Sequence, residues 1–151
     1  VLFILIIAGL LFSRFFVISG FVTELTDLVI NSGLSANGFL VLMVLMYLVL
    51  GMFIDPLSML VMTVPFIFPV VKGYGLDPIW FGVILCKMIE IAVITPPVGL
   101  NLFAVVSASE GQVKIGEMYF GIMPFVAIEL VVLLILILFP GISTWLPQTM
   151  M

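Results

Sequence analysis

The residues that could do chemistry in this sequence are polar residues that interrupt long apolar segments. One set interrupts residues 78–106 and consists of Thr95, Pro96, Pro97, Gly99 and Asn101. Proline has no amide N–H, so the two prolines leave the carbonyls of Ala92 and Val93 without helical partners. The broken helix then directs the negative end of one half and the positive end of the other to one place. This geometry favours a sodium ion beside a carboxylate-bearing solute; the alternative is a proline kink that only helps packing.

A second set interrupts the apolar tract of residues 39–71 and consists of Gly51, Asp55 and Ser58. A carboxylate in hydrocarbon is costly unless a sodium ion or a helix N-terminus stabilises it. Asp55 directly precedes a proline, which is typical of a helix N-cap, so the ligand and cap interpretations can both hold. We predict that this turn lies close to residues 95–101. Together the two sets form the predicted ion and substrate site, with Na⁺ held by Asp55, Thr95 and Gly99.

The spacing and positions of the other ionisable residues predict structural roles rather than catalysis. Glu90 follows Lys87 by three residues, which favours an intrahelical ion pair over a direct ligand role. Glu129 lies near the middle of the last apolar segment and is predicted to face another helix or a missing subunit. The sequence has no histidine, the usual general base and commonest metal ligand, so an enzyme is not favoured. Because it has one cysteine, an intrachain disulfide is excluded.

The composition indicates an integral protein of the lipid bilayer. Of the 151 residues, 65% are hydrophobic and 8% are charged, whereas soluble domains are nearer half apolar and a quarter charged. The net charge of −4, with only four basic residues, argues against a nucleic-acid partner. The sequence opens on an apolar run with no initiator Met or basic region, so we interpret it as a piece of a longer membrane protein.

Apolar spacing and turn residues predict one all-α membrane domain over residues 1–151. The expected elements are a transmembrane helix (1–19), an interfacial helix (20–32), a helical hairpin (37–71), a proline-broken helix (78–107) and a transmembrane helix (117–139). Apolar and polar residues alternate at helical spacing in the second element, as in helices that lie in the membrane interface. Each half of the hairpin is marginal for a full crossing, and its turn holds one charge. We therefore favour a re-entrant hairpin over two full crossings.

Several motifs together resemble one family, the large membrane subunit (DctM-like permease) of tripartite ATP-independent periplasmic (TRAP) transporters. The resemblance covers its C-terminal portion, from about Phe39 to Pro147. It rests on Gly51-Met-Phe-Ile-Asp55-Pro, Thr63-Val-Pro65 with Pro69, Gly75-Leu-Asp-Pro-Ile-Trp-Phe-Gly82, Glu90-Ile-Ala-Val-Ile-Thr-Pro-Pro-Val-Gly-Leu-Asn-Leu-Phe103, Pro124-Phe and Phe139-Pro.

The resemblance implies an elevator-type secondary transporter built from two inverted repeats, of which this chain would hold the second. It implies symport with sodium as the coupling ion, no other cofactor, and C4-dicarboxylate or sialic-acid-like substrates. The implied partners are a small membrane subunit, a periplasmic substrate-binding protein and the missing N-terminal half of the same permease. The implied location is the bacterial inner (cytoplasmic) membrane, as a multi-pass protein. The fragment alone should not transport.

The implied orientation differs from the one that a count of basic residues gives. Arg14 and Lys72 share one side and Lys114 lies on the other, so a literal count places the first two in the cytoplasm. The resemblance places the hairpin mouth and the C-terminus in the periplasm, and we follow it. The alternatives are a different inverted-repeat, ion-coupled anion transporter, or a non-transporting membrane or channel subunit. The latter leaves the double proline and Asp55 unexplained.

Overall fold

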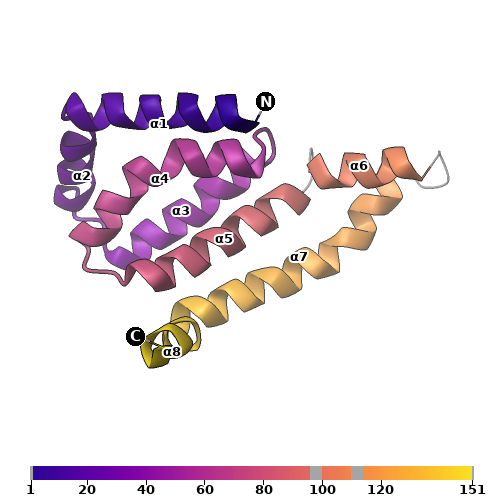
Figure 1. Cartoon of the computed structure of the whole chain (residues 1–151). Helices are drawn as coiled ribbons and strands as arrows, with labels where there is room; N and C mark the ends of the chain where they lie inside the picture. Colours follow the sequence, from indigo (N-terminus) through magenta and orange to yellow (C-terminus); the bar gives the residue numbers. More distant parts are fainter. Residues whose placement is uncertain (1, 96–99, 110–113, 151) are drawn as a thin grey trace.

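The computed structural model describes residues 2–95, 100–109 and 114–150, and every regular element in these ranges is a helix. The all-α prediction is therefore confirmed. The helices are α1 (Leu2–Ile18), α2 (Phe21–Asn31), α3 (Ala36–Gly51), α4 (Pro56–Gly73), α5 (Pro78–Ile94), α6 (Leu100–Ala108), α7 (Ile115–Leu138) and α8 (Gly141–Met150). Figure 1 shows α3 and α4 as an antiparallel hairpin with α5 alongside.

The core lies where the hairpin meets α5. Tyr47 of α3, Met59 of α4 and Ile84 of α5 are almost completely buried there, and Ile91 joins them near the end of α5. The one polar group among these side chains is satisfied, because the Tyr47 hydroxyl hydrogen-bonds to Oγ1 of Thr63 on α4. The hairpin and α5 therefore form one packed unit, in which α5 contacts both α3 and α4.

Side-chain caps determine where α3 and α5 begin. Ser35 caps α3 by accepting a hydrogen bond from the Gly38 amide (3.1 Å). Asp77 caps α5 by accepting from the amides of Ile79 (2.8 Å) and Trp80 (2.9 Å). These side chains replace intrahelical partners that the first amides of a helix lack. The polar turns between the helices are therefore structured rather than merely solvated.

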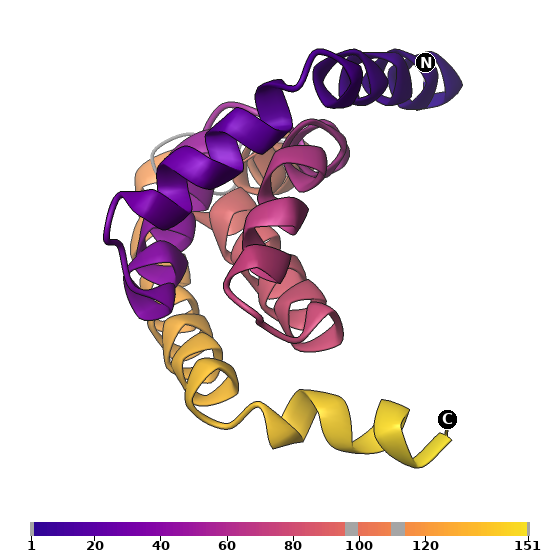
Figure 2. The ribbon, with the colours of Figure 1, turned by 90° about the vertical axis from the view of Figure 1, so that its left-hand side faces the viewer.

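The α1–α2 segment bends sharply at Gly20. Gly20 has a φ of 78°, a left-handed conformation that glycine adopts without a steric penalty. The axes of α1 and α2 differ by 69°, and Figure 2 shows α2 lying at an angle to α1. α2 packs against α4 near the hairpin mouth, where Ile30 lies against Gly73. This helix occupies the residues predicted to be interfacial.

The C-terminal helices follow the side of α5. The indole N–H of Trp80 donates to the Leu136 carbonyl of α7 (2.8 Å), which joins the start of α5 to the end of α7. The last helix expected from the sequence covers residues 117–139, and no helix was expected after it. Instead α8 follows, because the Pro140 carbonyl accepts from the amides of Ser143 and Thr144 (both 3.1 Å) and starts a new helix.

Two described helices, α4 and α7, are long and apolar enough to cross a membrane, and the bent α1–α2 pair is a third candidate. α7 exposes large apolar side chains along its length, including Phe120, Phe125 and Leu134. Such a surface is expected in contact with lipid, where it needs no polar cover. These features describe a membrane protein with several spans.

Candidate functional site

The tip of the hairpin lies against the last turns of α5. Gly51 ends α3 and is buried, and it faces Ala92, which is fully buried two residues before the end of α5. A side-chain Cβ placed on Gly51 would lie 3.0 Å from both the Cα and the carbonyl carbon of Ala92 and would overlap its Cβ. The two backbones therefore approach closely only because residue 51 has no side chain. The hairpin therefore contacts α5 at Ala92, three residues before the predicted set begins (Figure 1). Its proximity to residues 95–101 stays a prediction, because residues 96–99 lie outside the described part of the chain.

Asp55 lies in the turn of the hairpin and caps α4. Its Oδ1 accepts a hydrogen bond from the Ser58 amide (3.0 Å), and Pro56 takes the first helical position. The cap interpretation is thus confirmed. The carboxylate is half-buried, and the cap occupies one of its two oxygens. The ligand interpretation, which could hold alongside the cap, stays a prediction.

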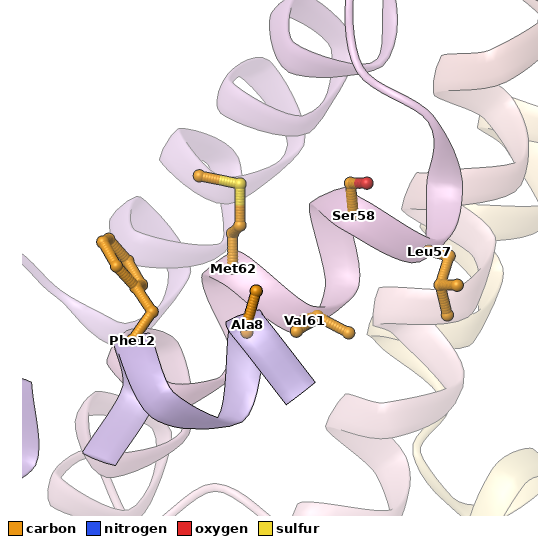
Figure 3. Close-up of a pocket in the computed structure, with 7 residues that line it drawn as sticks. Ala8, Phe12, Leu57, Ser58, Val61 and Met62 are labelled. Carbon is orange, nitrogen blue, oxygen red and sulfur yellow. The ribbon is translucent and has the colours of Figure 1, made fainter. Parts of the chain in front are cut away.

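Ser58 interacts with the Asp55 carboxylate through its side chain as well as its amide. It lines a cavity of about 220 Å³ between the start of α4 and α1, together with Ala8, Phe12 and Val61. Figure 3 shows Ser58 on the first turn of α4, with its hydroxyl pointing away from Ala8, Phe12 and Val61 in this view. The Ser58 amide donates to the cap formed by Asp55, and the predicted role of Ser58 in binding ion or substrate stays a prediction.

Thr95 ends α5 in an extended conformation, with ψ at 129°, as expected for a residue that precedes proline. Its hydroxyl donates to the Ile91 carbonyl (2.6 Å), and its amide donates to the Ala92 carbonyl (3.3 Å). The expectation that Ala92 has an unpartnered carbonyl is therefore wrong. The sequence reasoning considered only bonds between residues four apart, and the helix end tightens to a three-residue spacing instead.

The rest of the predicted set cannot be placed side chain by side chain. Pro96, Pro97 and Gly99 lie outside the described residues, and so does the side chain of Asn101, whose backbone lies in the first turn of α6. What the structure describes is the helix on either side: α5 ends at Ile94 and α6 begins at Leu100. These ends flank the predicted break.

Three charged side chains meet between α5 and α7. Lys87 Nζ lies 2.7 Å from Glu90 Oε2 on the same helix, which confirms the predicted intrahelical pair. The same Nζ lies 2.6 Å from Glu129 Oε2 on α7. Glu129 was predicted to face either another helix or a missing subunit, and this ion pair shows that it faces another helix. The partner itself was not predictable from the sequence, because the pairing depends on how α5 and α7 pack.

We expect Lys87→Met to destabilise the full-length protein by about 3 kcal/mol. The substitution leaves Glu129 without its cation in a partly buried position, and breaking such a pair costs about 3–5 kcal/mol when the charge left behind is buried. The measurement is the thermal unfolding midpoint in detergent. A second substitution, Glu129→Gln, should restore most of the loss. A Lys87→Met protein with a wild-type midpoint would contradict a stabilising role for the pair.

The fold and this site define a class of protein, a multi-pass helical membrane protein in which a helical hairpin packs against the end of a helix. The family described as "Tripartite ATP-independent periplasmic transporter, DctM component" matches residues 1–142. The chain belongs to this family.

Individual relatives agree with the family match. The chain is 35% identical over 127 residues to the C4-dicarboxylate TRAP transporter large permease protein DctM of Vibrio cholerae, covering 84% of this chain and 28% of the relative. It is 38% identical over 131 residues to the Pseudomonas aeruginosa protein of the same name, covering 87% and 29%. It is 34% identical over 109 residues to the sialic acid TRAP transporter large permease protein SiaM of V. cholerae, covering 72% and 25%. The chain thus spans less than a third of the length of these relatives.

Proposed function

We propose that this chain is part of a secondary active, sodium-coupled transporter that imports organic acids of the C4-dicarboxylate or sialic-acid-like class. The observation that carries the proposal is the contact of Gly51 with Ala92, because it brings a turn holding a carboxylate to the end of α5. Apolar helices that only anchor a protein do not need such a contact. Relatives named for C4-dicarboxylate and sialic acid transport support the substrate class.

The proposed sodium ligands are oxygen atoms at this contact. The Asp55 carboxylate accepts from the Ser58 amide at Oδ1 and also interacts with the Ser58 hydroxyl, and its remaining lone pairs would bind a cation. The Thr95 hydroxyl donates its proton to Ile91, and its oxygen lone pairs remain able to accept a cation. Backbone carbonyls near Gly99 would complete the set, as in transporters whose interrupted helices coordinate sodium.

The proposed substrate position is the start of α6. The first amides of a helix lack intrahelical acceptors and, with the helix dipole, attract anions. Leu100 begins α6, and Asn101 lies in its first turn, next to the end of α5. A carboxylate of the substrate at this point would lie close to the proposed cation, which would offset its charge.

The whole transporter would contain parts that this chain does not. We propose that the upstream part of the permease supplies an inverted repeat with its own hairpin, and that the assembly moves as an elevator in the bacterial inner membrane. A small membrane subunit and a periplasmic substrate-binding protein would complete it. The length of the relatives, more than three times that of the matched region, supports this division.

The experiment that tests the proposal is Asp55→Asn in the full-length permease. Asparagine caps helices about as well as aspartate, so it keeps the bond to Ser58 and removes only the charge. We expect the apparent affinity for sodium to fall at least about tenfold, equivalent to about 1.4 kcal/mol. Uptake of a labelled C4-dicarboxylate or sialic acid against sodium concentration measures it.

Asp55→Ala is the comparison, because it removes both the charge and the cap. Loss of the cap alone costs about 1 kcal/mol of stability and should appear as lower expression. If Asp55→Asn shows unchanged sodium dependence while Asp55→Ala loses stability, Asp55 is a cap only and the proposed ion site is wrong.

A further inference from the structure

The C-terminal helix α8 follows directly from the end of a helix that is long enough to cross the membrane. α7 has 24 residues, or about 36 Å of helix at 1.5 Å per residue, and the hydrocarbon core is about 30 Å thick. Since α7 begins directly after Lys114, its other end at Leu138 reaches the opposite boundary of the hydrocarbon. Figure 2 shows α8, in yellow, turning away from the axis of α7. α8 therefore lies near the boundary between hydrocarbon and water.

The side chains of α8 are arranged with the apolar ones outside. Ile142, Trp145, Leu146 and Met150 are exposed, and steps of three or four residues place them on one face of the helix. Thr144 is only 8% exposed, and α8 contacts α5. The Thr144 hydroxyl is satisfied within the helix, because it donates to the carbonyl four residues earlier (3.1 Å). A helix on the surface of a soluble domain turns its apolar face to the core, so α8 shows the reverse arrangement.

The exposed apolar face of α8 continues the surface that α7 offers to lipid. Leu138 at the end of α7 and Phe139 in the turn are exposed as well. No charged residue follows Glu129 in the sequence, so this surface has no ion pair to offer a soluble partner. Trp145 is 68% exposed, and tryptophan is enriched at the boundary between membrane and water, where its ring is apolar and its N–H is polar. Continuity with α7, the absence of charge and the exposed indole all favour lipid as the occupant.

We propose that α8 is a lipid-binding surface that lies in the bilayer interface and holds Ile142, Trp145 and Leu146 among the acyl chains next to the headgroups. The binding comes from buried apolar area and from the indole, so it does not depend on the charge of the headgroup. The inference is separate from the proposed transport function. It also concerns residues that lie almost entirely beyond the family match, which ends at residue 142.

The contacts of α8 give this surface a structural role. α8 packs on α5, and the start of α5 is joined to the end of α7 by the hydrogen bond from Trp80 to Leu136. A helix held in the interface therefore sets the depth of this end of α5 in the membrane. The hairpin tip contacts the opposite end of α5, at Ala92, so the lipid contact and the candidate ion site lie at different ends of the same helix.

The test measures what surrounds α8 in the full-length protein after reconstitution in phosphatidylcholine liposomes. A nitroxide spin label is attached to the single cysteine introduced by Ile142→Cys, Leu146→Cys or Gln148→Cys, with Cys86 and any other cysteine replaced by serine. Electron paramagnetic resonance compares the label's collision rate with oxygen, which dissolves in hydrocarbon, and its rate with a water-soluble nickel complex. Leu134→Cys, at an exposed position of α7, gives the reference for contact with lipid.

We expect the labels at positions 142 and 146 to collide more often with oxygen than with nickel, as the label at position 134 does. Gln148 is an exposed polar residue on the flank of α8, and a label there should show an oxygen-to-nickel ratio about threefold lower. More collisions with nickel than with oxygen at positions 142 and 146 would mean that water covers the face. An immobile label that neither reagent reaches would mean that another protein segment covers it. Either result overturns the proposal.

A pair of charge substitutions tests the orientation of α8. Leu146→Glu places a carboxylate in the proposed lipid contact and should lower the oxygen-to-nickel ratio at position 142 about threefold, because a charge is costly in hydrocarbon. Gln148→Glu adds the same charge on the polar flank and should leave that ratio unchanged. Equal ratios in the two variants would overturn the proposed orientation. If Leu146→Glu does not fold, the labels in the otherwise unchanged protein still decide the proposal.

A change of headgroup tests whether charge contributes. Liposomes in which about a third of the phosphatidylcholine is replaced by anionic phosphatidylglycerol should give the same ratios at positions 142 and 146, because α8 has no charged residue. Lipid contact that appears only with the anionic lipid would overturn binding through apolar area. None of these readouts measures transport, so a loss of sodium-dependent uptake contradicts the proposed function alone, and a loss of lipid contact contradicts this inference alone.

Discussion

Gly51→Ala is expected to reduce uptake by the full-length permease about tenfold or more, because it adds one carbon where none fits. The new Cβ would overlap the Cβ of Ala92 and lie 3.0 Å from two of its backbone atoms. Ala92 is fully buried within α5, so it has no space to move into. Overpacking of this kind costs about 1–3 kcal/mol, and the simplest relief is separation of the hairpin tip from α5.

The control is the same substitution on α5 itself. Gly82→Ala also adds one Cβ to a helical glycine, but it meets no atom within 4 Å. It should leave uptake unchanged and stabilise the helix by up to about 1 kcal/mol. Both proteins would be measured for sodium-dependent uptake and thermal midpoint after purification. If Gly51→Ala behaves like Gly82→Ala, the close contact is not needed for transport.

Replacement of both Pro96 and Pro97 by alanine is expected to abolish uptake while leaving the protein inserted in the membrane. Alanine favours a helix by about 3 kcal/mol relative to each proline, and it restores two amides. The extended backbone of Thr95, which precedes the prolines, would then return to helical geometry. Carbonyls at the end of α5 would be taken up by intrahelical bonds, and the start of α6 would lose its exposed amides. Uptake by the purified protein in liposomes measures the effect.

Pro124→Ala provides the comparison. Pro124 lies inside α7, which continues as one helix through it, so its replacement adds an amide without closing a break. This variant should transport at a near-normal rate. A double variant at positions 96 and 97 with near-normal sodium affinity and uptake would show that the prolines serve packing alone.

The sequence by itself determined the features that arise between neighbours in the chain. Ser35 and Asp55 cap helices because their side chains reach an amide three residues away, and Lys87 reaches Glu90 because the two are one turn apart. The helical class follows from long apolar segments that leave the backbone no partner except itself. The break at the two prolines was also predicted from the residue types in that stretch. It stays a prediction, because residues 96–99 lie outside the described part of the chain.

Only the tertiary structure decided which surfaces meet. The pairing of Lys87 with Glu129 and the fit of Gly51 against Ala92 join residues about 40 positions apart, and no rule for neighbouring residues reaches that far. Such contacts depend on the angle and register at which helices pack, and small differences there move a side chain by a full turn. The sequence alone assigns Lys87 to Glu90, whereas the packing of α7 on α5 makes the same lysine the partner of Glu129 as well.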